Sequence, residues 1–351
     1  MSKKEKKKIL FELYSSNLKS IFDNAKNKDL SKDFGCYCPI CEKHFTINEY
    51  QNLSLEHNPP KSLGGKDNVL TCVKCNNIAG SKIDAEILLA LNEFEFMKFK
   101  PNSSLKTRFY NKSTGENGVN GSFNIDKNGA VILNISQANN PKTKDAFVNS
   151  FEYEKIAYDV LKCNLENFGL NKKLNFEIKK PNRRNERLAS IALLKMAYLL
   201  AFEKLGHIVM FGRYMRIVRN QIQNPDKDII TKPFWLHYNY PDNMLGVNII
   251  TKPFELKSLL IVFDLMTKSD TYRIGICLPG FDENDDKIYD NIETLVCKDE
   301  GKIDFETNNY LNHEFNIRES EKALLPMIYW EKLFEYITAH NTSYKQFGDL
   351  P

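Results

Sequence analysis

The sequence predicts an α+β fold, in which a small cysteine-rich finger near the N-terminus precedes a larger region of mixed helices and strands. Three observations lead to this expectation. Two Cys-x-x-Cys pairs lie within residues 35–100, short alternating segments with turn residues follow from about 105, and a strongly apolar helix pattern covers about 184–205. A chain of 351 residues is long for one compact domain, so we expect two or three units.

The N-terminal third is expected to contain two segments. Residues 1–34 have the pattern of one amphipathic helix after a run of lysines that we expect to be solvated, followed by a polar linker. Residues 35–100 contain the cysteine cluster and end in the helical pattern IDAEILLALNEFEFM. We therefore place one domain at 35–100.

Residues 101–351 are expected to form a mixed α+β region. Turn pairs such as Asn-Gly between short alternating runs predict a β-meander at about 105–140. A helix at 143–166, the strand LNFEIKK, the apolar helix ending before Gly206 and a last helix at about 320–339 follow. IVMFG, LKSLLIVFDL and RIGICLPG are expected to be strands, and FGRYMRIVR at 211–219 to be either a basic strand along a nucleic-acid backbone or an edge strand.

The overall composition is that of an ordinary globular protein, with 42% hydrophobic and 27% charged residues. The net charge of +4 does not by itself indicate a partner that is a polyanion. The longest apolar stretch, 188–202, is too short to span a bilayer comfortably and is interrupted by Lys195. No apolar signal segment follows the basic start, so we expect a cytoplasmic protein with no membrane partner.

Five of the eight cysteines fall within residues 36–75. Two Cys-x-x-Cys pairs can complete a tetrahedral sulfur shell, so the sequence predicts a structural Zn²⁺ site. Its ligands would be Cys38, Cys41, Cys72 and Cys75. The alternative is a redox-active Cys-x-x-Cys pair. Cys36 is expected to be a bystander or a competitor of Cys38, and His44 a surface residue or a substitute ligand. The scattered Cys163, Cys277 and Cys297 are expected to be small buried hydrophobes.

A second group of polar residues lies between the two cysteine pairs. In LSLEHNPPKSLGG, Glu56 and His57 close a short alternating strand, and two prolines stop it. Asn68 precedes a second strand, and Asn76 follows Cys75 at the start of a helix. The expected local order is therefore strand, loop, strand and helix.

The segments CPIC, LEHNPPKSLGGKDN and LTCVKCNN together resemble the HNH endonuclease family, also called the ββα-metal or His-Me finger nucleases. The resemblance covers about residues 36–96. It implies that His57 is the general base, that Asn68 steadies the loop and the imidazole, and that Glu56 and Asn76 hold a divalent cation. Many relatives have Asp where this chain has the longer Glu56. The implied products carry a 5′-phosphate and a 3′-hydroxyl.

The chemistry can also be argued from the residue types. Phosphodiester hydrolysis needs a base that takes a proton from water, and histidine titrates near neutrality. It also needs positive charge where negative charge develops, and a hard cation such as Mg²⁺ or Mn²⁺ binds carboxylate and amide oxygens. The alternative interpretations are a surface pair without a function for Glu56-His57, a turn residue for Asn68 and a helix cap for Asn76.

The expected partner is DNA, with RNA as the alternative, and basic residues are candidates for phosphate contacts. These residues are Lys61, Lys74, Lys82, Arg183, Arg184 and Arg187. For each of them a solvated side chain is the competing interpretation. One such finger cuts one strand, so a double-strand break implies a homodimer or two separate encounters with the DNA. The C-terminal region could bind a regulatory partner. Restriction or antiphage defence fits this plan. The rival hypothesis is a non-catalytic, zinc-stabilised nucleic-acid-binding module.

Overall fold

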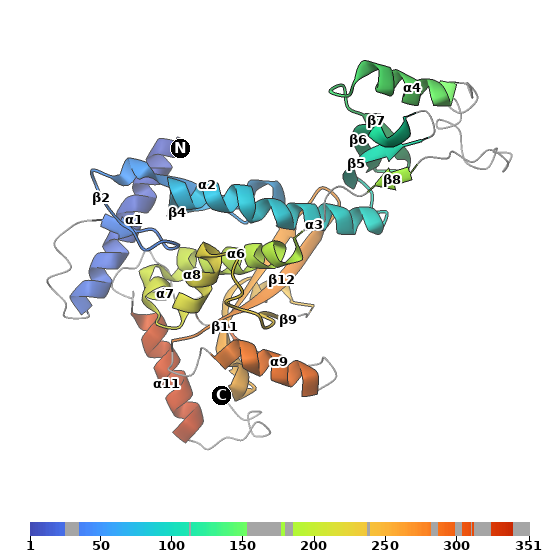
Figure 1. Ribbon diagram of the computed structural model, residues 1–351. Helices are drawn as coiled ribbons and strands as arrows, with labels where there is room; N and C mark the ends of the chain where they lie inside the picture. Colours follow the sequence, from blue (N-terminus) through green and yellow to red (C-terminus); the bar gives the residue numbers. More distant parts are fainter. Residues whose placement is uncertain are drawn as a thin grey trace. The chain divides into compact units, whose positions relative to one another are not determined.

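The computed structural model describes residues 1–24, 35–111, 114–152, 177–179, 185–236, 239–281, 287–298, 304–309, 311 and 324–339. Helices and strands are both abundant, so the fold is α+β (Figure 1). The chain divides into two compact units, one formed by residues 1–88 with 186–351 and the other by residues 89–185. In the part of the chain that is described, no helix is both long and apolar enough to cross a bilayer.

The N-terminal part of the first unit contains a long helix, two antiparallel hairpins and the helices that follow them. Its elements are α1 (Lys3–Asn24), β1 (Gly35–Tyr37), β2 (His44–Thr46), η2 (Tyr50–Asn52), β3 (Leu53–Asn58), η3 (Lys61–Leu63), β4 (Lys66–Cys72), α2 (Val73–Lys82) and the start of α3 (Asp84–Met97). β3 pairs with β4 from Leu53 opposite Cys72 to Glu56 opposite Val69, and the register shifts before Asn58. The expected order of strand, loop, strand and helix is therefore confirmed.

The C-terminal part of the first unit is built around one buried helix and one antiparallel sheet. Its elements are α6 (Glu186–Leu205), α7 (His207–Phe211), α8 (Met215–Gln223), β9 (Trp235–Leu236), η6 (Asp242–Met244), β10 (Gly246–Lys252), η7 (Phe254–Leu256), β11 (Ser258–Met266), β12 (Thr271–Leu278), α9 (Ile288–Lys298), β13 (Glu306–Asn308) and α11 (Leu325–Ala339). The sheet order is β13-β10-β11-β12-β9. α6 contacts both the β3–β4 hairpin and strands β10, β11 and β12.

The second unit is a small meander covered by a helix. Its strands are β5 (Ser104–Tyr110), β6 (Val119–Ile125), β7 (Val131–Ile135) and β8 (Glu177–Lys179), in the order β7-β6-β5-β8, with η4 (Gly115–Asn117) and α4 (Pro141–Glu152). Phe109, Val119 and Phe147 form its core. The meander expected at about 105–140 is confirmed. The helix expected from 143 begins at Pro141, and its later residues lie outside the described part of the chain.

The structure divides the chain into units that differ from the domains expected from the sequence. Residues 35–100 were expected to form a domain of their own, but residues 35–88 share one unit with the C-terminal part of the chain. The reason is α6, which is apolar on nearly all sides and so needs neighbours all round. The β3–β4 hairpin and the five-stranded sheet supply those neighbours, whereas a lone hairpin buries too little apolar surface for independent stability.

The prediction for residues 208–219 is also wrong. IVMFG was expected to be a strand, and FGRYMRIVR either a basic strand or an edge strand, but the structure places α7 and α8 there. Met215, Val218 and Ile222 are buried at helical spacing along α8. Arg219 is buried as well, where it donates to the Met210 carbonyl and pairs with Glu42. This segment therefore packs in the first unit and does not form a basic strand.

Candidate metal centre and the His57 hollow

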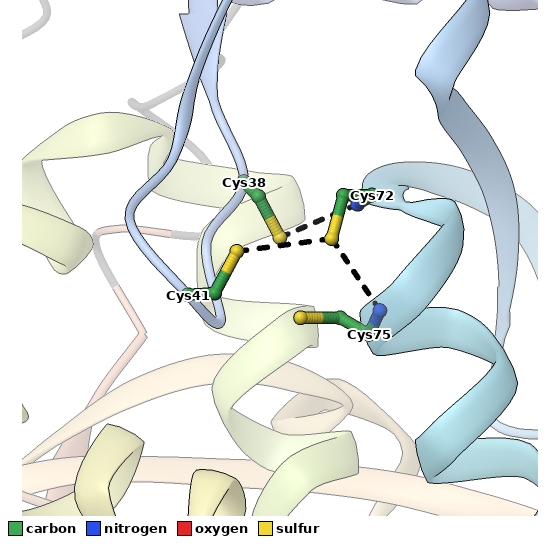
Figure 2. Close-up of side chains that lie close together, drawn as sticks. All are labelled: Cys38, Cys41, Cys72 and Cys75. Carbon is green, nitrogen blue, oxygen red and sulfur yellow. Dashed lines mark hydrogen bonds between the residues drawn. The ribbon is translucent and has the colours of Figure 1, made fainter.

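Two short segments of the chain, residues 38–41 and 72–75, bring the four predicted zinc ligands together. Cys38 and Cys41 lie in the tight turn after β1, whereas Cys72 ends β4 and Cys75 lies in the first turn of α2 (Figure 2). The turn is closed by the Glu42 amide, which donates to the Cys38 carbonyl at 2.9 Å. Cys72 caps α2, because its sulfur accepts from the Cys75 amide at 3.4 Å.

The sulfur geometry fits a tetrahedral metal. All four Sγ atoms lie within 4.8 Å of one another, and those of Cys41 and Cys72 are 3.7 Å apart. A tetrahedron with Zn–S bonds of about 2.3 Å has sulfur atoms about 3.8 Å apart. These four cysteines could therefore hold a metal such as zinc. Hydrogen bonds among the four thiols lower the pKa of Cys72 and Cys41 and raise that of Cys38, so the sulfurs share their protons within the cluster.

Two other candidates lie near the cluster. Cys36 is buried on β1 and lies outside the four-sulfur group, and burial raises its pKa to about 12. His44 also lies outside this group; it is half-buried on β2 against Tyr37, with ring centroids 4.9 Å apart. Cys277 is buried in β12, as expected, whereas Cys163 and the side chain of Cys297 lie outside the described part of the chain.

Helices from the C-terminal part hold the first cysteine turn. The Tyr198 hydroxyl of α6 donates to the Pro39 carbonyl at 2.8 Å, and the Gln223 amide of α8 donates to the Ile40 carbonyl at 2.5 Å. The ion pair between Arg219 and Glu42 lies at the same turn. The sequence contained no signal for these contacts, because the partners are more than 150 residues apart.

His57 lies half-buried near the end of β3, in a hollow of about 560 Å³. The hollow is lined by the helix α1, the turn η2 and the hairpin, through Lys3, Lys4, Lys7, Tyr50, Gln51, Leu53, Ser54, Leu55, His57 and Asp67. Hydrogen bonding to Lys6 lowers the pKa of Asp67, and His57 adds to the effect. The lysines of α1 were expected to be solvated, so their position beside His57 is what the sequence reasoning missed.

Glu56 points to the opposite face of β3, as alternation along a strand requires. Its Oε1 accepts from Nζ of Lys195 at 2.7 Å, and the same ammonium pairs with Asp84 at 2.7 Å. The side chains of Lys195, Glu56 and Asp84 are 1%, 3% and 11% exposed. A divalent cation held by Glu56 beside His57 does not fit this arrangement, because the buried ammonium of Lys195 already pairs with this carboxylate.

The pKa values of the buried trio follow from its charges. Burial raises the pKa of Glu56, and it outweighs the opposite effect of Lys195. For Lys195 burial acts to lower the pKa, but Asp84 and Glu56 outweigh it and the pKa is raised. Two carboxylates therefore share one ammonium, and the trio carries a net negative charge when all three groups are ionised.

The two asparagines are positioned by different contacts. Nδ2 of Asn76 donates to Oγ of Ser54 at 2.9 Å and to the Leu55 carbonyl at 3.3 Å, so α2 is held against β3. Nδ2 of Asn68 donates to Glu203 of α6 at 2.9 Å. Asn68 thus steadies β4 against α6, and its amide nitrogen does not orient the imidazole of His57.

The backbone of the loop between β3 and β4 requires glycine at positions 64 and 65. Gly64 has a φ of 85°, which favours glycine, and a Cβ on Gly65 would lie 1.5 Å from the Pro59 carbonyl oxygen. The chain therefore folds back on itself shortly after His57, and β3 ends at Asn58.

The basic residues expected to contact phosphate do not gather at His57. Lys61, Lys74 and Lys82 are exposed on η3 and α2, and none of them lines the hollow. Arg187, in the first turn of α6, pairs with Asp228 at 2.5 Å. Arg183 and Arg184 lie outside the described residues.

Comparison of the chain with protein-family models, curated proteins and solved structures finds no match.

Proposed function

We propose that the chain is an endonuclease that hydrolyses phosphodiester bonds of DNA, with His57 as the general base. The observation that carries the proposal is the position of His57. It lies near the end of the first strand of a strand–loop–strand–helix element, in a hollow that also contains lysine side chains. The resemblance of the same segment to HNH nucleases supports the same chemistry.

In the proposed reaction, His57 takes a proton from water, the water oxygen attacks phosphorus, and the bond to the 3′ oxygen breaks. Ammonium groups beside the phosphate stabilise the negative charge that develops on the phosphoryl and leaving oxygens. His57 is half-buried and lines the hollow, so part of its side chain is accessible from there. Asn76 supports the reaction indirectly, because it fixes the strand that carries His57.

A catalytic Mg²⁺ or Mn²⁺ on Glu56 and Asn76 does not fit the residues as they lie. The Glu56 carboxylate is buried against Lys195, and a cation there would lie beside an ammonium. We therefore assign no step to a divalent cation at this position, and the dependence on Mg²⁺ or Mn²⁺ is left to the cleavage experiment.

We propose a structural role for Zn²⁺ at the four cysteines. The ion would link the turn after β1 to the start of α2, and so brace the hairpin between them. No group other than the four sulfurs is needed to complete a tetrahedral shell, which is typical of a structural rather than a catalytic zinc site.

The test is cleavage of supercoiled plasmid by the wild-type chain, His57→Gln and the matched control His44→Gln, with Mg²⁺, with Mn²⁺ and with EDTA. We expect nicking by the wild type and by His44→Gln, and a loss of at least about 100-fold in His57→Gln, since general acid–base catalysis contributes about that much. Equal nicking by all three proteins would show that His57 is not the base.

The second candidate function is a non-catalytic, zinc-stabilised nucleic-acid-binding module. The observation that favours it is the ion pair between Glu56 and Lys195, which removes the carboxylate expected to hold the catalytic cation. Binding of DNA without nicking under every metal condition would support this candidate over the nuclease.

A further inference from the structure

The first turns of α1 concentrate positive charge at one place. Lys3, Lys4, Lys6, Lys7 and Lys8 lie within six residues at the N-terminus of this 22-residue helix. Like charges spaced three or four residues apart destabilise a helix, and cations at its N-terminus oppose the helix dipole. The arrangement therefore works against the stability of α1 itself, which is expected where lysines face an anion.

The start of α1 nevertheless has a defined geometry. The Glu5 amide donates to Oγ of Ser2 at 3.2 Å, and the Ser2 amide donates to Oε2 of Glu5 at 2.7 Å. This reciprocal pair is a capping box, which fixes the first turn. The backbone positions of the lysines in the first two turns are therefore well defined.

Local contacts divide these lysines into two groups. Lys6 pairs with Asp67 at 2.5 Å, and Lys8 pairs with Glu12 at 3.8 Å, so carboxylates neutralise both. Lys3 and Lys4 are exposed and line the hollow that contains His57. Among the described residues, no carboxylate forms an ion pair with Lys3, Lys4 or Lys7, so these three lysines add positive charge to the wall of the hollow.

Lys7 is the most firmly placed of the three. Its Nζ donates to the Gln51 carbonyl at 3.0 Å and lies 5.5 Å from the centroid of the Tyr50 ring. Burial lowers its pKa. An anion in the hollow would relieve that cost, because it favours the charged form of the amine.

We propose that Lys3, Lys4 and Lys7 of α1 bind the phosphate backbone of the DNA strand that passes His57. Lys3 and Lys7 are one turn, about 6 Å, apart along the helix. A strand held along this row runs across the hollow with one of its phosphodiesters beside His57. The assignment rests on the proposed nuclease function and adds to it the surface that holds the substrate.

Charge on the same wall supports this choice of partner. The acidic residue that lines the hollow is Asp67, and its carboxylate already forms an ion pair with Lys6. The remaining charged side chains there are the three lysines, so the wall favours an anion. The Tyr50 ring beside Lys7 offers an aromatic face of the kind on which bases of a single strand stack.

The experiment measures binding apart from cleavage. Fluorescence anisotropy with a labelled DNA oligonucleotide, single-stranded and as a duplex, is recorded in EDTA at several salt concentrations. The test variant is the triple substitution Lys3→Gln, Lys4→Gln and Lys7→Gln. The control is the triple substitution Lys8→Gln, Lys19→Gln and Lys127→Gln, which removes the same charge from exposed positions outside the hollow.

We expect the test variant to bind DNA about tenfold or more weakly, and to lose about 0.7 to 0.9 from the slope of log Kd against log salt for each phosphate contact removed. The control variant should keep the wild-type slope to within about one contact. Wild-type affinity and slope in the test variant, an equal loss in the control, or no DNA binding by the wild type would each overturn the inference. An RNA oligonucleotide of the same sequence tells whether the row discriminates between the two nucleic acids.

The two proposals fail in different ways. If the wild type does not nick plasmid under any metal condition but binds DNA more tightly than the triple-lysine variant, the proposed nuclease function fails and the lysine row stands. If the wild type nicks plasmid and the test variant binds as tightly as the wild type, the lysine row fails and the nuclease function stands.

Discussion

Replacing Lys195 with methionine would remove the ammonium from a buried trio and keep most of the volume of the side chain. In the folded chain Glu56 and Asp84 would then lose their shared cation, which is 2.7 Å from each carboxylate. Because Glu56 is 3% exposed, water cannot replace the lost partner there. We expect Lys195→Met to lower the free energy of unfolding substantially.

The size of the loss follows from what the carboxylate can do without its partner. Breaking one side of a buried ion pair costs about 3 to 5 kcal/mol. The alternative for Glu56 is to take up a proton, which costs about 3.7 kcal/mol at pH 7 for a carboxyl with an ordinary pKa of about 4.3. The two routes agree, so the expected loss is about 3 to 4 kcal/mol, a large share of the 5–15 kcal/mol typical of folded domains.

The pH dependence gives a second readout with a definite sign. Without the ammonium, burial raises the pKa of Glu56 further, so the folded state binds a proton that the unfolded state does not. Stability then falls as the pH rises through the folded-state pKa. The deficit of Lys195→Met relative to the wild type should therefore be largest at pH 7 and should shrink toward pH 5.

Urea unfolding, followed by the fluorescence of the buried Trp330, measures this deficit. The control is the combined substitution Lys195→Met, Glu56→Gln and Asp84→Asn, which removes every charge of the trio and should recover at least half of the loss. A deficit below about 1 kcal/mol at pH 7, or one that does not change with pH, would refute the buried ion-pair network.

Three further predictions concern the metal centre, the loop and α6. The wild-type chain should carry one tightly bound Zn²⁺ by elemental analysis, and Cys72→Ser should lose it together with the ordered finger. Gly65→Ala should destabilise the chain by about 2 kcal/mol in urea unfolding, since the new Cβ would overlap the Pro59 carbonyl oxygen, whereas Gly80→Ala, which has open space in α2, should be neutral or stabilising. Arg187→Ala should leave DNA affinity unchanged by anisotropy, because its guanidinium is already paired with a carboxylate, and a clear loss would return it to the DNA-binding surface.

Elements with a strong local signal could be predicted from the sequence. The spacing of Cys38–Cys41 and Cys72–Cys75 allowed one metal to be expected, and the four sulfurs do lie together. The alternation in LSLEH and the prolines after it predicted a strand that ends near residue 58, as β3 does. In each case the residues that determine the structure are neighbours in sequence, so their pattern was sufficient.

The prediction for 211–219 was wrong because its arginines were taken for one face of a strand. They stand at 213, 216 and 219, and this spacing of three residues fits a helix rather than the two-residue period of a strand. Met215, Val218 and Ile222 have similar spacing and are buried in α8. Arg219 was expected on a strand along nucleic acid or on an edge strand, but it is buried, and its partner Glu42 is far away in the sequence.

Lys195 shows most clearly what a single sequence can and cannot reveal. A lysine in the middle of an apolar helix requires a buried acceptor, because a buried charge without a partner is very costly. The sequence therefore shows that Lys195 needs an acidic partner, but it contains 45 acidic residues and does not identify which of them is the partner. Since packing of α6 on the hairpin selects Glu56, this carboxylate cannot neutralise the lysine and also serve as a free ligand for a divalent cation. A cleavage activity that depends on Mg²⁺ would then require either another ligand set or a rearrangement that separates Glu56 from Lys195.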